Sequence, residues 1–430
     1  QAPEDAPPPI ALVGATLIDG TGAPPVPGAT VVVREGRIAC AGPAADCPVP
    51  DDARRIDVAG RWITPGLIDA HVHYSQTGWA DGRPDALDLR DEYPYEETVH
   101  WLETHPDVLG RGYLCSGVTA TFDVGGYPWT WGLRSRSDTS GLMPHVEAAG
   151  PLLSTRDHWL NLPAERQFVF IPDDSAVEAG VDYLAVNGTS AVKVWFLVGA
   201  RSDTAALRHR LETAATRARE AGIPLIVHAT GLWDATVAVE NGAHLLVHSV
   251  QDEAVDERFL RAAREAGTLY TPTLVVYDGY AQLAARRFEP GPYGDALACV
   301  DPTSLAKARA TDEVPGGIGG DQLESLRARA AGRRRVTAEN LRRVRDAGIP
   351  VVLGTDAGNP LTLHGPSVYL ELEAMADAGL SPAEVLVAAT RDAARAMGRE
   401  DDLGTLEPGK VADLLVLRAD PLADVRGWRA

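Results

Sequence analysis

The stretch LRHRLETAATRAREAGIPLIVHA, residues 207–229, holds a helix pattern, a turn and a strand pattern in direct succession. In its first half, apolar residues recur every three or four positions among charged ones, which is typical of a helix with one buried face. A glycine then marks the helix end, and the apolar run IPLIVHA is typical of a buried strand. The stretch therefore predicts one helix–strand unit that carries a histidine, His228, at the end of its strand.

The middle of the chain repeats this unit. Strand-like runs lie at residues 63–73, 118–124, 143–150, 190–198, 223–229, 243–250, 267–276 and 349–358. Amphipathic stretches separate most of these runs, and glycine again follows a helix pattern in EAGTL and DAGIP. Eight alternating units predict an α/β fold, a (β/α)8 TIM barrel.

The two ends of the chain differ from the middle. Both are rich in short strand patterns broken by Gly and Pro. We predict a small β-sandwich domain built from both termini, residues 1–63 and 401–430, and a barrel over 64–400. The interval 277–335 is too long for a simple crossover and contains EPGPYG and VPGGIGG, so we expect an insertion over the barrel mouth, a lid.

The composition of the chain limits the classes of molecule that it is expected to bind. The chain has 430 residues and a formal net charge of −20, which argues against binding to nucleic acid or to an anionic lipid surface. No apolar run is long enough to span a membrane. The expected partner is a small-molecule substrate, and a homo-oligomer is left open.

The cysteines bear on the compartment. Cys40 and Cys47 bracket the turn-forming stretch AGPAAD, where a disulfide would close a short loop in an oxidising compartment. The lead-in QAPEDAPPPIA is of the kind left after removal of a signal peptide. We therefore expect an exported protein, periplasmic or secreted; a trimmed chain and a cytoplasmic location are the open alternatives.

Polar residues end most of the predicted barrel strands, where TIM barrels place their active sites. They are His71 and His73 on the first strand, Lys193 on the fourth, His228 on the fifth, His248 on the sixth and Asp356 on the eighth. Side chains two apart on a strand point the same way, and neutral imidazoles bind metals well. A lone H-x-H pair is more often an ordinary surface pair, but four partners on other strand ends favour a metal site.

Lys193 lies inside the apolar run SAVKVWFLV, where an ammonium is costly unless paired or neutralised. Lysine is scarce in this chain, and the remaining basic residues are mostly arginine. An amine can lose its charge and react, whereas a guanidinium cannot. Carboxylation by CO2 would give an anionic carbamate able to bridge two metals. The alternative is a lysine that snorkels out of a core strand.

Together these residues resemble the amidohydrolase superfamily. The likeness rests on PGLIDAHVH, the strand-four lysine, single histidines on strands five and six, GTDAG, and the closing segment LGTLEPGKVADLLVL. It covers nearly the whole chain after residue 10 and is most similar to the binuclear imidazolonepropionase-related and prolidase-like members.

The resemblance implies a role for each residue. His71, His73 and Asp356 would bind one metal, and His228 and His248 a second. Carboxylated Lys193 and a hydroxide would bridge both ions. Asp356 would take the proton of the hydroxide and pass it to the leaving group. The ions are expected to be zinc, with Mn, Co or Fe as alternatives.

Further residues are weaker candidates for the substrate pocket. His158, in GPLLSTRDHW, resembles a substrate-facing histidine of prolidase-like relatives that would polarise the carbonyl oxygen. His364, in GNPLTLHGPS, follows the eighth strand, and Tyr277 lies where it would line the pocket. No clear carboxylate-binding arginine ends a strand, which leaves Arg156 and Arg201 as candidates.

Departures from the family pattern narrow the reaction. Zinc deaminases of the superfamily usually carry Glu where this chain has Gly231, and prolidase-like enzymes often carry Tyr where it has Thr230. The sequence therefore predicts a binuclear hydrolase that cleaves an amide-type C–N bond, peptide-like or cyclic. The same site acting on a lactone, carbamate or phosphoester is the alternative. A mononuclear deaminase and a non-catalytic metal-binding protein are disfavoured.

Overall fold

A computed structural model describes residues 7–157 and 167–430, and the chain divides into two compact units. Unit 1 comprises Gln1–Ile68 and Leu380–Ala430, and unit 2 comprises Asp69–Gly379. Both ends of the chain thus belong to one unit and its middle to another. The divisions fall after residues 68 and 379, whereas the sequence placed them after 63 and 400.

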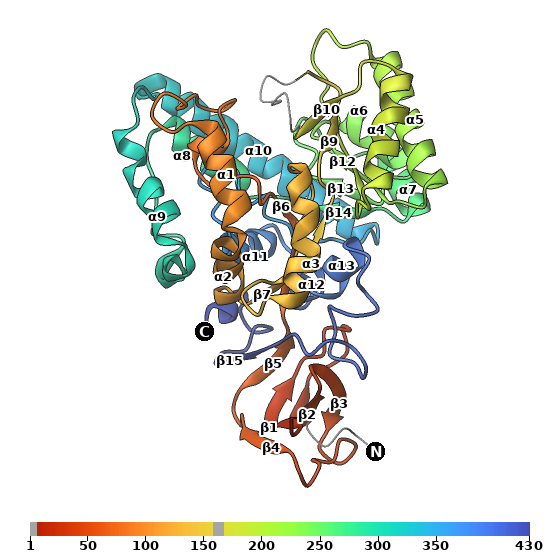
Figure 1. Cartoon of the computed structure of the whole chain (residues 1–430), viewed down its shortest axis with the longest axis vertical. Coiled ribbons are helices and arrows are strands. Elements are labelled where there is room, and N and C mark those ends of the chain that lie inside the picture. Colours follow the sequence, from red (N-terminus) through yellow and green to blue (C-terminus); the bar gives the residue numbers. More distant parts are fainter. Residues whose placement is uncertain (1–6, 158–166) are drawn as a thin grey trace. The chain divides into compact units, whose positions relative to one another are not determined.

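Unit 1 contains a six-stranded sheet (Figure 1) with the order β15-β5-β1-β2-β3 and with β4 paired to β1. The strands are β1 (Ile10–Leu17), β2 (Val26–Arg34), β3 (Arg37–Pro43), β4 (Arg54–Asp57), β5 (Trp62–Pro65) and β15 (Leu414–Leu417). The C-terminal strand β15 pairs antiparallel with β5, so residues near both ends complete one sheet. The helices α12 (Pro382–Ala388) and α13 (Arg391–Ala396) also belong to this unit. The two-layer sandwich stays a prediction, because the pairing of the described residues gives a single sheet.

Unit 2 is a mixed α/β structure with parallel sheets. One sheet has the order β10-β9-β11-β12-β13-β14, and the other has the order β6-β7-β8. The strands are β6 (Leu67–Val72), β7 (Val118–Asp123), β8 (His145–Ala148), β9 (Leu152–Ser154), β10 (Phe168–Phe170), β11 (Val192–Trp195), β12 (Leu225–His228), β13 (Leu245–Val247) and β14 (Leu269–Thr271). Each begins in unit 2 except β6, which starts two residues before it.

The eighth strand-like run of the sequence forms single parallel bridges rather than a regular strand in the described structure. Val351 bridges to Tyr270, and Ala357 bridges to Val72. The run therefore lies beside both β14 and β6, the outermost strands of the two sheets. The pairing of the described residues does not form a closed ring, so the closed barrel also stays a prediction.

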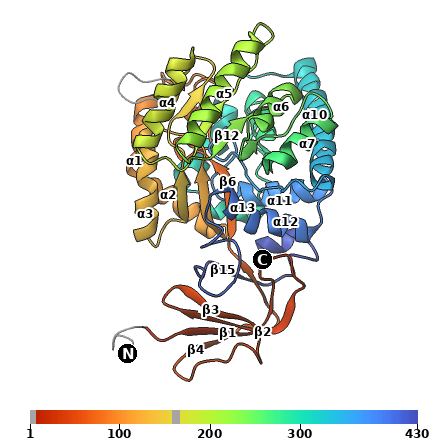
Figure 2. The ribbon, with the colours of Figure 1, turned by 90° about the vertical axis from the view of Figure 1, so that its right-hand side faces the viewer.

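Helices flank the parallel strands of unit 2 (Figure 2). They are α1 (Tyr95–Thr104), α2 (Pro106–Cys115), α3 (Gly132–Thr139), α4 (Asp174–Val186), α5 (Thr204–Glu220), α6 (Leu232–Glu240), α7 (Glu257–Ala266), α8 (Val276–Ala284), α9 (Pro302–Arg309), α10 (Gly320–Asp346) and α11 (Ser367–Asp377). The Asp203 carboxylate caps α5 by accepting from two main-chain amides. Gly222 and Gly267 follow α5 and α7 with φ of +68° and +67°, as the helix–Gly–strand pattern predicts. Among the described helices, none is both long and apolar enough to cross a membrane.

The segment between α8 and α10 is fastened to the rest of unit 2. A disulfide joins Cys115, at the end of α2, to Cys299. The Lys307 ammonium lies 2.7 Å from the buried Asp81 carboxylate. Trp79 donates from its indole nitrogen to Thr311 at 3.0 Å. The predicted insertion therefore has regular structure: α9 lies inside it, and the 27-residue α10 runs from it to the eighth strand-like run.

Another disulfide joins Cys40 to Cys47 in unit 1, as the sequence predicts, whereas the pairing of Cys115 with Cys299 was not foreseen. The Cys40–Cys47 bond closes a sequence separation of 7 residues, and the Cys115–Cys299 bond closes a separation of 184. A crosslink restrains the unfolded chain more strongly when it closes a longer loop.

Replacing Cys115 and Cys299 together by Ser is expected to lower the free energy of unfolding by about 2–4 kcal/mol. Urea denaturation followed by circular dichroism measures this loss. The paired control, Cys40→Ser with Cys47→Ser, should lose less. Equal losses in the two double variants would contradict the loop-length argument.

Candidate metal centre

One cavity of about 270 Å³ in unit 2 contains all six strand-end residues singled out in the sequence. His71, His73, Lys193, His228, His248 and Asp356 line it together. The structure thus brings together residues spread from position 71 to position 356. Their individual roles remain predictions, but their convergence on one cavity is a feature of the structure.

The parallel strands explain this convergence. Lys193 lies on β11, His228 ends β12, and His248 directly follows β13. Parallel strands end at the same edge of a sheet, so residues at their carboxyl ends meet there. The main-chain amide of Asp356 donates to the carbonyl of His71 at 2.7 Å, which places Asp356 beside β6.

The atoms at the centre of the cavity suit a cation. The Asp356 Oδ1 lies 3.2 Å from His71 Nε2 and 3.0 Å from His73 Nε2. One ligand atom each from His71, His248 and Asp356 fit within 4.8 Å of one another. The Asp356 Oδ1 is buried, lies beside two imidazole nitrogens and makes no hydrogen bond of good geometry. Because buried polar atoms normally have partners, this carboxylate oxygen fits a bound divalent metal.

Contacts at Nδ1 fix the imidazole rings of His73 and His248. The Nδ1 of His73 lies 2.7 Å from the carbonyl oxygen of Gly125, and the Nδ1 of His248 lies 3.1 Å from Thr273 Oγ1. Such contacts fix the tautomer and turn the other ring nitrogen toward the metal position. Asp356 and His248 also have φ of +62° and +75°, a left-handed conformation that is costly outside glycine. This strain is concentrated at two of the predicted ligands.

Burial sets the charge states. It lowers the pKa of His71, His228 and His248 well below the usual value, with nearby cationic groups adding to the effect. The imidazoles are therefore neutral, which is the form that binds metals. Burial also lowers the pKa of Lys193 to about 7, against the opposing influence of Asp356. Its amine is accordingly available in the uncharged, reactive form.

Asp356 keeps its charge. Burial alone would raise the pKa of its carboxyl, but His73, His248 and Lys193 outweigh burial and lower that pKa below its usual value. Behind it, Asp69 accepts hydrogen bonds from the amide and the hydroxyl of Thr355 at 3.0 and 2.6 Å. Burial raises the pKa of Asp69 to about 7. Asp69 thus anchors the turn that presents Asp356.

A polar wall of the cavity was not predicted from the sequence. Arg83 donates to both carboxylate oxygens of Asp85 at 2.7 and 2.6 Å, and to Asn359 Oδ1 at 2.5 Å. The same Oδ1 accepts from Tyr280 at 2.7 Å, and Asn359 Nδ2 donates to the carbonyl of Asp356 at 3.1 Å. Arg83, Tyr280 and Asn359 all line the cavity. One hydrogen-bonded chain therefore reaches from Asp85 to the main chain of Asp356.

Part of the cavity lining is apolar. Phe168, Trp195, Leu197 and Val276 contribute to it. Tyr277 also lines the cavity, as expected, and its hydroxyl accepts a hydrogen bond from Gln251. Burial raises the pKa of Tyr277, so its hydroxyl stays protonated. The cavity therefore offers both charged and apolar side chains to a bound molecule.

The predicted substrate contact of His364 is corrected by the structure. His364 is buried, with its Nδ1 2.8 Å from the Tyr113 hydroxyl and its Nε2 2.7 Å from the Gln76 carbonyl oxygen. Both ring nitrogens are thus engaged within the protein, and the side chain does not line the metal-centre cavity. Following the eighth strand in sequence did not place His364 at the mouth, because the loop folds back toward α2.

The other candidates fall outside this cavity or outside the described structure. His158 lies among residues 158–166, outside the described residues. Arg156 and Arg201 do not line the cavity, and the arginine that does is Arg83. No strand-end signal could have found Arg83, because it lies ten residues beyond His73 in a loop. Asn359 was easier to identify from the sequence, because it lies three residues after Asp356 in GTDAGN.

Neutral imidazoles, a carboxylate and an uncharged amine around one cavity at the ends of parallel strands define the site of a metal-dependent hydrolase. The model of the Amidohydrolase family matches residues 62–429 of the chain. The chain belongs to the amidohydrolase family and is a hydrolase acting on C–N bonds.

Individual relatives span several activities. The chain is 30% identical to an imidazolonepropionase of Rhizorhabdus wittichii, over 92% of this chain and 90% of the relative. It is 25% identical to a 5-methylthioadenosine/S-adenosylhomocysteine deaminase of Symbiobacterium thermophilum, over 96% and 85%. Among solved structures, a putative prolidase from Bifidobacterium longum superposes with a TM-score of 0.71 at 23% identity, over 98% and 92%. The last likeness concerns the fold.

In the metal-free protein, the buried imidazoles of His71, His228 and His248 are expected to lower stability as pH falls from 7 to 5. The buried carboxyls of Asp69 and Glu371, whose pKa values are raised to about 7 and about 8, act in the opposite direction. The pKa values of His71, His228 and His248 are lower in the folded chain than in the unfolded chain. Below about pH 6.5, these imidazoles therefore bind protons in the unfolded chain but not in the folded chain. Each imidazole then costs about 1.4 kcal/mol per pH unit. Urea unfolding at pH 5, 6, 7 and 8 measures the slope.

The control for that slope is His248→Asn, which removes one of the three buried imidazoles. Its stability should depend less steeply on pH over the same interval. His209→Asn removes an imidazole that is 64% exposed and should leave the slope unchanged. The same dependence on pH in His248→Asn and in the unmutated metal-free protein would show that this imidazole is not held neutral.

Proposed function

We propose that the chain hydrolyses an amide-type C–N bond with two divalent metal ions held in this cavity. The observation that carries the proposal is Lys193, which is 2% exposed and shares the cavity with four histidines and Asp356. A lysine whose pKa is lowered to about 7 has a substantial uncharged fraction at neutral pH and is suited to carboxylation by CO2, and the resulting carbamate would bridge two ions. His71, His73 and Asp356 would hold one ion, and His228 and His248 the other.

When bound, the two ions supply activation of the attacking water and polarisation of the scissile carbonyl. Zinc suits this imidazole and carboxylate set. The proton chemistry belongs to Asp356, whose depressed pKa keeps it ionised and able to accept a proton. Asp356 lines the cavity, so the same carboxyl could pass the proton to the leaving nitrogen.

The closed (β/α)8 barrel is part of the same proposal. Support comes from the bridges that place the eighth strand-like run beside both β6 and β14. In a closed barrel these two contacts complete the circuit of strands. The active site would then lie at the carboxyl ends of the strands, where this cavity is found.

Deamination is disfavoured by the chemistry at the start of α6. A carboxylate that could serve as proton shuttle is missing at Gly231, and the nearby Asp234 is already engaged. Its Oδ2 accepts from the amides of Thr230 and Gly231 at 2.8 and 3.1 Å. Hydrolysis of a lactone, carbamate or phosphoester by the same residues is the alternative, and a substrate panel with these bonds separates them from amides.

We also propose that Arg83 and Asn359 hold a polar or anionic end of the substrate while Trp195 and Leu197 pack on an apolar end. Arg83 spends three of its donors on Asp85 and Asn359, which fixes the guanidinium and leaves further N–H groups for a ligand. The cavity of about 270 Å³ admits only a small molecule.

An oxidising compartment is proposed as well. The four cysteines form two disulfides, one in each unit, and no free cysteine remains. Disulfides persist mainly in exported proteins.

Lys193→Ala is expected to lose one of two bound metal ions and at least about 10²-fold in kcat, because the bridging group is removed. Metal analysis by mass spectrometry and turnover of an amide panel measure both effects. Lys193→Arg is the comparison variant, since it keeps a long basic side chain that fills the space but cannot be carboxylated. Short-chain carboxylic acids should partly restore Lys193→Ala and leave Lys193→Arg inactive. Full metal content in both variants would refute the bridging role.

Arg83→Gln is expected to raise KM for an anionic amide substrate about 10- to 100-fold and to change kcat less, because a charge-assisted contact made in the ground state is lost. Steady-state kinetics on an anionic amide and its neutral counterpart measure the split. The neutral substrate should show little change in KM. An equal rise in KM for both substrates would assign Arg83 to shaping the loop instead.

A further inference from the structure

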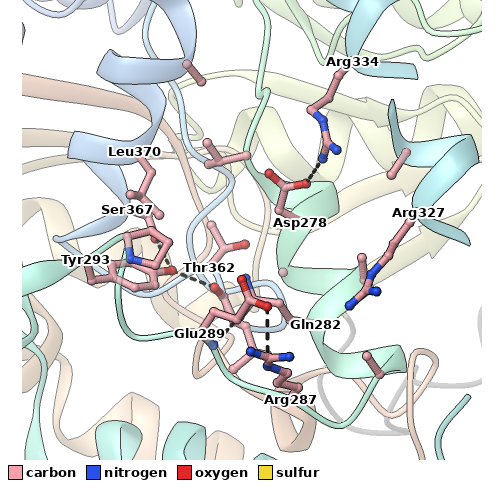
Figure 3. Close-up of a pocket in the computed structure, with 18 of the residues that line it drawn as sticks. Asp278, Gln282, Arg287, Glu289, Tyr293, Arg327, Arg334, Thr362, Ser367 and Leu370 are labelled. Atoms are coloured by element: carbon pink, nitrogen blue, oxygen red, sulfur yellow. Dashed lines mark hydrogen bonds and ion pairs between the residues drawn. The ribbon is translucent and has the colours of Figure 1, made fainter. Parts of the chain in front are cut away.

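A second and larger cavity lies in unit 2. Its volume is about 670 Å³, and it is bounded by α8, α10, α11 and the turn at residues 361–362 (Figure 3). Among the described residues of the predicted metal centre, none lines it. It therefore needs an explanation of its own.

Helix α8 separates the two cavities. Val276, Tyr277 and Tyr280 line the metal-centre cavity, whereas Asp278 and Gln282 line the second one. This division follows from helix geometry, since residues one or two apart point to different faces. The two spaces thus lie on different faces of one helix.

The helix is seated directly on the turn that forms part of the second cavity. A Cβ at Gly279 would approach the carbonyl oxygen of Pro360 to 2.2 Å, so only glycine fits there. The Thr362 side chain lines the cavity, is 2% exposed, and its Oγ1 has no hydrogen-bond partner. A buried hydroxyl without a partner is uncommon and points to a missing polar group.

The charged side chains around the cavity differ in whether they are paired. Arg334 lies 2.5 Å from Asp278, and Arg287 lies 3.5 Å from Glu289. Within the described part of the chain, Arg327 has no acidic partner. Figure 3 shows its guanidinium on the α10 side of the cavity. The unpaired guanidinium is suited to a planar anion, which it can hold through two parallel hydrogen bonds.

The rest of the lining offers apolar contact. Ala281 of α8 and Ala285, just after it, line this space together with Leu323 and Ala330 of α10 and Leu370 of α11. Small side chains on two of the helices keep the space open. A ligand that satisfies both the apolar lining and Arg327 must be amphipathic.

We propose that this second cavity is a binding site for a small organic carboxylate with an apolar body, the carboxylate on Arg327 and a polar group near Thr362. The site is distinct from the metal centre, and the proposal does not rest on the proposed hydrolysis. Asp377, at the exposed end of α11, also lines the cavity without a partner among the described residues. A preference for cationic ligands is therefore the competing outcome.

The test uses 4-(4-bromophenyl)butyrate, its primary amide and the matching amine as probes, titrated calorimetrically into the metal-loaded protein. The carboxylate should bind at least about 10-fold more tightly than the amide, and Arg327→Gln should remove that difference. Arg329→Gln is the control, because Arg329 lies on the same helix, contacts Ser325 and does not line the cavity. Thr362→Val, a substitution of similar shape, should weaken binding a few-fold.

Anomalous scattering from bromine in crystals of the complex locates the probe. Bromine in the cavity between α8 and α10, together with the Arg327 dependence, supports the proposal. Bromine only at the metal centre, tightest binding of the amine, equal affinity of carboxylate and amide, or full affinity in Arg327→Gln would each overturn it. Hydrolytic activity is not a readout of this test, so failure of the proposed reaction and failure of this site are distinguishable.

Discussion

The buried carboxylate of Asp69 is the contact on which the rest of the site depends. It accepts two hydrogen bonds from Thr355 across a sequence separation of 286 residues and a third from the amide of His71 at 3.3 Å. These bonds join the strand that carries the histidine pair to the turn that carries Asp356. They add to the main-chain hydrogen bond from Asp356 to His71 and to the bridge between Val72 and Ala357, which join the same two segments. A buried polar network of this kind is stable only when every member has its partner, which makes the arrangement specific.

The sequence predicted the metal centre better than the substrate pocket, for a physical reason. Strands have a fixed side-chain period, and parallel strands end at one edge, so His228 and His248 could be placed from their strand positions alone. A loop has no such period. Arg83 comes from a loop and was missed, and His364 was misplaced because its loop turns back toward Tyr113. The same limit explains why the eighth strand-like run appears as isolated bridges, since its Gly, Thr and Asp residues favour turns over a ladder.

The site also illustrates the cost of a preformed metal centre. Three imidazoles are held neutral, the pKa of Lys193 is lowered to about 7, and two residues have a left-handed backbone, all of which disfavour the folded chain. A metal bound to the folded state alone would return part of that free energy. Folding and metal loading would then be coupled.

The attachment of the segment between α8 and α10 affects how far the sequences of related proteins can differ in this region. Cys299, just before α9, is fixed to α2; Lys307, within α9, pairs with Asp81; and Thr311, just after α9, accepts from Trp79. Substitutions or short insertions in the exposed turns at residues 289–292 and 315–317 can then accumulate without displacing α8, which carries Tyr277 and Tyr280 into the metal-centre cavity. Relatives could thus vary this surface widely while the geometry of the reaction stays the same.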